Sequence, residues 1–241
     1  MISSIPNKNK MKIGKIKMTC DDCGLNVPYP LQRSNFFYIL AGSPGSGKTN
    51  LLMSLITKNR KFYNKQFHRI WVFSNSLHTI KKRIDVPPSQ LIHGFSEASL
   101  EKVLDIEQKD YDNLEEGEEP NKILIIFDDV VSQLQRNMQS LLKLAFNRRH
   151  ISGGLSMMIT TQKFNAIPLE LRTASSGLFV FDTKNKQEID AIWKEYISLP
   201  RDIFLKVLKF VFDRPHNFLY LNFELPADKM MFKGFDQIVI D

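Results

Sequence analysis

The chain has 241 residues, of which 43% are hydrophobic, and its formal net charge at pH 7 is +7. This length and hydrophobic content suit a globular protein with a substantial buried core and exclude disorder over the whole chain. No apolar run approaches the ~20 residues that a membrane helix needs, and residues 1–12 lack the apolar stretch of a signal peptide. We therefore expect a soluble, intracellular protein with no membrane span.

The charge is unevenly distributed. Residues 105–119 contain eight acidic residues against one lysine, which is −7 and leaves +14 for the remainder of the chain. Such a basic surface attracts polyanions and fits nucleic acid, although a basic balance is also common in proteins that bind none. Residues 1–17 carry five lysines among small and polar residues, the composition of a flexible arm. We treat residues 1–33 as a basic lead-in.

Cys20 and Cys23 are the only cysteines, and their spacing matches half of a structural zinc site. Two further ligands would have to come from histidines such as His68 or His150, or from a second subunit. Free reduced thiols are the favoured interpretation, and so few cysteines do not indicate a disulfide scaffold.

Short apolar runs alternate with segments of helical periodicity along most of the chain. The runs that indicate strands are 35–42, 68–75, 122–129, 154–162, 176–183 and 217–225. The segments that indicate helices are 48–59, 96–108, 131–148, 186–196 and 201–212, and the acidic stretch up to Pro120 is expected to be a surface loop. This succession predicts a doubly wound α/β sheet with 217–225 added at an edge. We expect a core over 34–195 and an extension of the same domain over 196–241.

A phosphate-binding loop is predicted between the first strand and the first helix. Its sequence matches G-x-x-x-x-G-K-[ST], the Walker A motif, whose backbone N–H groups and helix N-terminus favour phosphate. Lys48 is expected to bridge the β- and γ-phosphates of ATP, and the Thr49 hydroxyl to bind Mg²⁺. The residues expected to contact the nucleotide are Gly42, Ser43, Pro44, Gly45, Ser46, Gly47, Lys48, Thr49 and Asn50.

The apolar run 123–127 ends in Asp128 and Asp129, which we interpret as the Walker B motif. Asp128 is expected to hold Mg²⁺ through water. Asp129 is the candidate general base that orients or deprotonates the attacking water. The alternative is an ordinary turn at the end of a strand.

One further strand is predicted between the two Walker strands. The run 154–162 would occupy this position, as in RecA-like ATPases that carry a catalytic acid. Gln162 at its end would then face the γ-phosphate, where its amide could sense the nucleotide and position water. The alternative is a glutamine that only caps the strand.

Four segments together are similar to one family: 41–52, 123–129, 146–162 and 169–181. They resemble the genome-packaging ATPases of poxvirus-like large DNA viruses and their virophage relatives, within the HerA/FtsK superfamily of DNA translocases. The resemblance covers roughly 34–195, and 196–241 matches no part of the family. The Asp-Asp pair also departs from the Asp-Glu of many cellular relatives, which shortens the reach of the base by one methylene.

The resemblance implies a ring of five or six subunits, with each nucleotide at a subunit interface and an arginine finger from the neighbour. By position, Arg148 and Arg149 match the family's basic motif before the sensor strand. Arg172 matches the arginine that follows the sensor glutamine in related translocases. Each arginine could instead form a salt bridge or bind a DNA phosphate.

The expected function is ATP-driven movement of double-stranded DNA into a preformed viral capsid. The implied partners are DNA phosphates, a homo-oligomeric ring and capsid or capsid-vertex proteins. The implied location is the host cytoplasm, at the virus factory, and the virion. The alternatives are another translocase or helicase, a nucleotide-dependent switch, or a nucleotide-binding virion component without turnover.

Overall fold

The computed structural model describes residues 24–58, 62–78, 86–134 and 138–240. Cys20, Cys23 and the five N-terminal lysines lie outside these residues. Within them, no helix combines the length and the apolar character that crossing a membrane requires.

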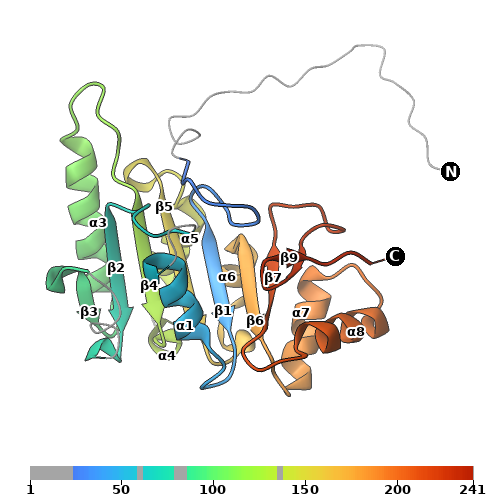
Figure 1. Cartoon of the computed structure of the whole chain (residues 1–241). Coiled ribbons are helices and arrows are strands. Elements are labelled where there is room, and N and C mark those ends of the chain that lie inside the picture. The colour runs from blue at the N-terminus through green and yellow to red at the C-terminus, as the bar shows by residue number, and fades with distance from the viewer. Residues whose placement is uncertain (1–23, 59–61, 79–85, 135–137, 241) are drawn as a thin grey trace, which may run out of the picture.

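A single sheet of nine strands forms the centre of the described structure, in the order β3-β2-β4-β5-β1-β6-β7-β8-β9 (Figure 1). The six strands from β3 to β6 in this order are parallel, and β7, β8 and β9 continue the sheet in antiparallel pairing. The strands span Phe37–Ala41 (β1), Arg69–Ser74 (β2), Leu91–His93 (β3), Ile123–Asp128 (β4), Leu155–Thr161 (β5), Gly177–Phe181 (β6), Phe218–Asn222 (β7), Met231–Lys233 (β8) and Asp236–Gln237 (β9).

Helices cover both faces of this sheet. They span Lys48–Met53 (α1), Glu97–Asp112 (α3), Val131–Leu134 (α4), Gln139–Asn147 (α5), Leu169–Ala174 (α6), Lys186–Tyr196 (α7) and Arg201–Val211 (α8). α1 continues into the π-helical turn Ser54–Lys58 and lies in front of the sheet in Figure 1, whereas α5 and α6 lie behind it.

Alternate side chains of the central strand enter two separate hydrophobic clusters. Phe37 and Ile39 of β1 face the cluster that includes α3, α5, α6 and α8, whereas Tyr38 and Leu40 face the cluster that includes α1. Because successive side chains in a strand point to opposite faces, a strand covered on both sides must be apolar throughout. All five residues of β1 are indeed buried.

The predicted order of the Walker strands is confirmed, since β5 lies between β4 and β1. The helix predicted over 96–108 is four residues too short, because α3 continues to Asp112 before the acidic loop begins. Within α3, Glu107 turns inward and accepts a hydrogen bond from Trp71 Nε1 at 2.6 Å. Asp110, beyond the predicted end, pairs with Arg69.

Two further expectations need correction. The helix predicted over 131–148 is described as two segments, α4 and α5, and 135–137 lie outside the described residues. The late strand β7 is not at the sheet edge, because β8 and β9 follow it. The small strands β3, β8 and β9 were not predicted, since two or three residues carry no measurable periodicity.

A buried polar network joins the segment before β1 to the strands β6 and β7. The side chain of Gln32 donates to Asn222 Oδ1 at 2.9 Å and accepts from Ser176 Oγ at 2.6 Å. Asn222 in turn donates to the carbonyl oxygen of Pro30 at 2.9 Å. These polar groups are all paired, which a buried network requires if it is to stabilise the fold.

Replacing Gln32 by leucine is expected to lower the free energy of unfolding by about 2–3 kcal/mol, because it removes the hydrogen bonds that Gln32 makes with buried Ser176 and Asn222. Urea unfolding followed by circular dichroism measures this change. Gln187→Leu, on the exposed first turn of α7, is the matched control and should change stability by less than about 0.5 kcal/mol. Equal effects of the two substitutions would contradict the role given to the network.

Candidate phosphate-binding site

The loop between β1 and α1 has the backbone of a phosphate cradle. Gly45 and Gly47 have φ angles of 76° and 111°, in the region that side chains rarely adopt. Gly42 is required for a different reason: a Cβ there would come within 2.7 Å of Phe181 Cβ. Gly47 precedes α1 with no side-chain cap, so the first N–H groups of the helix point toward a ligand.

Lys48 crosses the mouth of this loop. Its ammonium group donates to the carbonyl oxygens of Gly42 at 2.5 Å and Ser43 at 3.0 Å. Partial burial lowers the pKa of Lys48, and the carboxylates of Asp129 and then Asp128 oppose that shift. The lysine is thus positioned between the loop and the two acids, as a group that meets phosphate oxygens must be.

Asp128 is the last residue of β4, and its residue surface is only 6% exposed. Its two oxygens accept hydrogen bonds from Thr160 Oγ1 at 2.8 Å and Ser74 Oγ at 3.3 Å. Burial raises the pKa of Asp128 above its ordinary value, while the bonds from Thr160 and Ser74 lower it. The hydroxyl groups therefore help to keep a buried carboxylate charged.

Asp129 has a left-handed backbone, with φ 55°, and this conformation turns its exposed side chain toward the end of β5. Gln162 Nε2 donates to both carboxylate oxygens of Asp129, at 3.1 and 3.3 Å. The Asp129 N–H donates to Thr160 Oγ1 at 3.1 Å. Thr160 thus contacts both acids, and a strained backbone maintained by surrounding contacts is typical of functional positions.

These groups line one cavity of about 250 Å³ at the carboxyl edge of the sheet. Its lining residues are Pro44, Gly45, Lys48, Thr49, Ser76, Asp128, Asp129, Thr160 and Gln162. Ligands bind at this edge in open α/β sheets. The cavity therefore brings together five of the ten residues predicted for the phosphate and metal sites with the predicted Asp129 and Gln162, and adds Ser76 and Thr160.

The donor set of the cavity fits Mg²⁺. Thr49 and Asp128 offer oxygen atoms only, and Mg²⁺ is commonly held by one or two carboxylates together with ligand phosphates and water. Among the described residues, no group of three or more histidine, cysteine or acidic side chains could hold a metal ion by itself. Thr49 and Asp128 would hold the ion at the phosphates.

Replacing Thr160 by valine is expected to lower the rate of nucleotide hydrolysis about tenfold and to move its acid limb to higher pH. The hydrogen bond from Thr160 lowers the pKa of Asp128, so its loss raises that pKa further, and a higher pH is then needed to ionise the carboxylate. Turnover measured from about pH 5 to 8 tests this. Thr173→Val, on the exposed surface of α6, is the control. An unshifted acid limb would contradict the role of Thr160.

The three predicted arginines do not line this cavity. Arg148 is 7% exposed and donates to the carbonyl oxygens of Asn35 and Ala145, and burial lowers its pKa to about 10. Arg149 is exposed beside it, at the end of α5 near the amino end of β5. Within one subunit, both arginines therefore lie at the sheet edge opposite the phosphate loop.

Arg172 of α6 is engaged inside its own subunit. Its guanidinium pairs with Glu195 at 2.9 Å and lies over the ring of Phe164, 4.8 Å from its centroid. Five predicted nucleotide-binding residues also lie outside the cavity lining: Gly42, Ser43, Ser46 and Gly47 of the phosphate loop, and Asn50 of α1. The role of any arginine in a neighbouring subunit's site stays a prediction.

Sequence reasoning missed Ser74, Thr160 and His216. Ser74 and Thr160 lie near the ends of two predicted strands. Aligning those strands with the strand that ends at Asp128 would have placed both hydroxyl groups beside it. His216 lies 170 positions from Ser46 and nevertheless contacts its carbonyl oxygen, at 3.0 Å. No local pattern could have indicated that contact.

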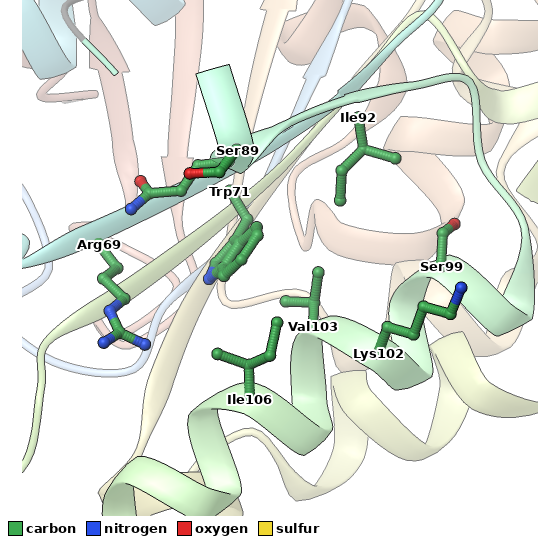
Figure 2. Close-up of a pocket in the computed structure, with 9 residues that line it drawn as sticks. Arg69, Trp71, Ser89, Ile92, Ser99, Lys102, Val103 and Ile106 are labelled. Atoms are coloured by element: carbon green, nitrogen blue, oxygen red, sulfur yellow. The ribbon is translucent and has the colours of Figure 1, made fainter. Parts of the chain in front are cut away.

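A larger cavity of about 590 Å³ lies elsewhere, between β2, β3 and α3 (Figure 2). Figure 2 shows Trp71 of β2 facing Val103 and Ile106 of α3. Arg69, the first residue of β2, also lines it, so the cavity extends toward the amino edge of the sheet. It includes none of the phosphate-loop or acidic residues described above. Size therefore does not identify the reactive site in this molecule.

Solved structures with the same fold are viral and bacterial ATPases. The DNA-packaging ATPase B204 of Sulfolobus Turreted Icosahedral Virus matches with a TM-score of 0.54 and 15% identity, covering 79% of this chain and 94% of that one. B204 of Sulfolobus turreted icosahedral virus 2, in complex with AMPPCP, matches with a TM-score of 0.53, 14% identity and coverage of 79% and 93%. ATPases 2 and 3 of EssC from Geobacillus thermodenitrificans match with a TM-score of 0.54, 17% identity and coverage of 86% and 41%.

At such low identity these likenesses show the fold alone, which is that of a P-loop NTPase with a mostly parallel sheet flanked by helices. A comparison with curated protein sequences finds no match. The sequence model of the family described as Poxvirus A32 protein matches residues 29–218, which is most of the chain. The match continues past 195, so the expectation that the family resemblance ends there is wrong for 196–218. The match confirms the resemblance to poxvirus-type packaging ATPases, and the chain belongs to the Poxvirus A32 protein family.

Proposed function

We propose that the chain is a Mg²⁺-dependent ATPase that drives double-stranded DNA into a preformed viral capsid. The observation that carries this proposal is the pairing of Asp129 with Gln162 on the side of the cavity that faces Lys48. A protein that only binds nucleotide needs the loop and the lysine. It does not need a carboxylate aligned by an amide where water would attack.

The residues of the cavity divide the work of hydrolysis. Backbone N–H groups of the loop and Lys48 bind the β- and γ-phosphates, and Thr49 and Asp128 would hold Mg²⁺. When bound, Mg²⁺ would supply positive charge to the phosphate oxygens. Gln162 holds the carboxylate of Asp129 in one orientation, and Asp129 then accepts a proton from, or orients, the attacking water.

Three observations support DNA as the substrate that is moved. The chain belongs to the Poxvirus A32 protein family, and B204, a protein of the same fold, is described as a DNA-packaging ATPase. Outside 105–119 the sequence carries +14. Because such charge meets phosphates rather than bases, binding should depend strongly on salt and little on sequence.

None of the described residues that line the cavity is an arginine, and in a ring of five or six copies a neighbour can provide one. A neighbour would supply the finger that stabilises the charge of the transition state, an effect of about 10³–10⁵ in rate. Arg149 is the exposed candidate, whereas Arg148 and Arg172 are engaged within their own subunit. The assembly would act in the cytoplasm of the infected cell and contact a capsid vertex.

Steady-state ATP hydrolysis with and without long double-stranded DNA tests the proposal. We expect DNA to stimulate turnover and added salt, from about 0.05 to 0.2 M, to suppress the stimulation. Single-stranded DNA of equal phosphate content is the control that separates a double-strand motor from a helicase. Tight ATP binding without DNA-stimulated turnover, in a chain shown to assemble into rings, would refute the motor and favour a nucleotide-binding virion component.

A further inference from the structure

The loop between α8 and β7, residues 212–217, contacts the phosphate loop from the C-terminal part of the chain. His216 Nδ1 lies 3.0 Å from the carbonyl oxygen of Ser46, and a Cβ on Gly47 would lie 3.4 Å from the same nitrogen. In Figure 1 the link from α8 to β7 passes close to the loop that follows β1. This connection places an imidazole directly beside the phosphate loop.

The loop that carries His216 is braced on the side away from the phosphates. Asp213 pairs with Lys233 of β8 at 2.8 Å, and Asn217 donates to Asp213 Oδ1 at 2.7 Å. His216 has a φ of 66°, a conformation that is uncommon for residues other than glycine. Strain of this kind persists where surrounding contacts determine the backbone, and it is concentrated at ligand sites.

The hydrogen bond to Ser46 fixes the chemistry of the imidazole. A carbonyl oxygen can only accept, so Nδ1 must carry the hydrogen and donate it. In the neutral ring Nε2 is then an acceptor, and none of the hydrogen bonds found among the described residues uses it. His216 is exposed, so Nε2 is available to a hydroxyl or amino group of a ligand.

The position of His216 decides which part of a nucleotide it meets. The strand β1 lies between β5 and β6. Gln162, which follows β5, and its partner Asp129, which follows β4, lie on the β5 side, whereas His216 precedes β7, which pairs with β6. A triphosphate whose terminal phosphate lies beside Asp129 therefore has its sugar and base toward the β6–β7 side. The sugar, being nearest to the phosphates, is the part within reach of an imidazole bonded to Ser46.

We propose that residues 212–217 form a nucleoside subsite that selects ribonucleotides, in which His216 Nε2 accepts a hydrogen bond from a sugar hydroxyl. The proposal rests on ATP being the ligand of the phosphate loop, as in the function above. It assigns to the C-terminal extension a direct part in recognising the substrate.

The test measures dissociation constants of ATP, 2′-deoxy-ATP, 3′-deoxy-ATP and inorganic tripolyphosphate, in the presence of Mg²⁺. The variant is His216→Asn, because asparagine also tolerates the left-handed backbone and its amide can still donate to the Ser46 carbonyl oxygen. Asparagine has no imidazole ring and therefore no acceptor at the position of Nε2. His150→Asn, at the exposed end of α5 on the opposite edge, is the matched control.

We expect the unmodified chain to bind ATP at least about fivefold more tightly than one of the two deoxy analogues, the value of one hydrogen bond. His216→Asn should remove that preference and leave tripolyphosphate binding unchanged, and His150→Asn should retain it. Equal binding of the three nucleotides, or a preference that survives in His216→Asn, would overturn the subsite. If the preference is found but DNA never stimulates turnover, the subsite stands and the motor function fails.

Discussion

Replacing Asp129 by asparagine is expected to lower the rate constant for ATP hydrolysis by about 10²- to 10⁴-fold and to leave ATP binding nearly unchanged. Gln162 donates a hydrogen bond to the Asp129 carboxylate, and both side chains line the cavity that contains Lys48. Asparagine removes its basicity but keeps its size. Because asparagine also adopts left-handed backbone readily, the φ of 55° at this position is preserved.

Single-turnover hydrolysis and equilibrium binding of a labelled ATP analogue together measure this effect. Asp182→Asn, an exposed acid just after β6, is the charge-matched control and should retain the rate of the unmodified chain. If Asp129→Asn kept more than a tenth of that rate, another group would have to be the base. If ATP binding fell to the same extent, Asp129 would contribute to binding the nucleotide before reaction and not to the hydrolytic step alone.

Replacing Lys48 by methionine should weaken ATP binding by at least about tenfold and reduce turnover by about 10²- to 10³-fold. The ammonium group already lies between the phosphate loop and the two acids, so its removal takes the positive charge from where the β- and γ-phosphates bind. Methionine keeps most of the aliphatic side chain. The change therefore tests the charge rather than the packing.

Lys163→Met is the matched control, because Lys163 is an exposed lysine next to Gln162 and carries the same charge near the same cavity. Titration of both variants with ATP and with tripolyphosphate separates a specific contact from a general field. Equal losses in the two variants would show that net charge near the cavity, and not the position of Lys48, determines affinity.

The sequence predicts the glycine loop and the Walker strands well because their signals are local. A glycine loop between an apolar strand and an amphipathic segment has one common structural outcome, and an apolar run that ends in two acids indicates a buried parallel strand. Because β1, β4 and β5 are parallel, their carboxyl ends lie at one edge of the sheet. Gln162 then comes to lie beside Asp129 by register alone.

What the sequence cannot predict depends on contacts between distant segments. His216 reaches Ser46 only because three antiparallel strands continue the sheet beyond β6, and 217–225 by itself suggested one edge strand. α3 continues four residues beyond its predicted end at 108, into a stretch whose charge alone suggests a loop, and Asp110 there pairs with Arg69 of β2. In both cases a tertiary partner overrides the local pattern.

The position of β1 at the centre of the sheet has a consequence for how the chain folds. Phe37 pairs with Met157, which lies 120 positions further along the sequence, and Tyr38 pairs with Gly177. At about 5–20 residues per second, a ribosome needs roughly 6–24 s to produce the first of these partners after β1 is made. During that time a wholly apolar strand has no sheet neighbour, and non-local pairing of this kind is slow and prone to aggregation. Of the described strands, the one that leads into the phosphate loop thus waits longest for its first partner.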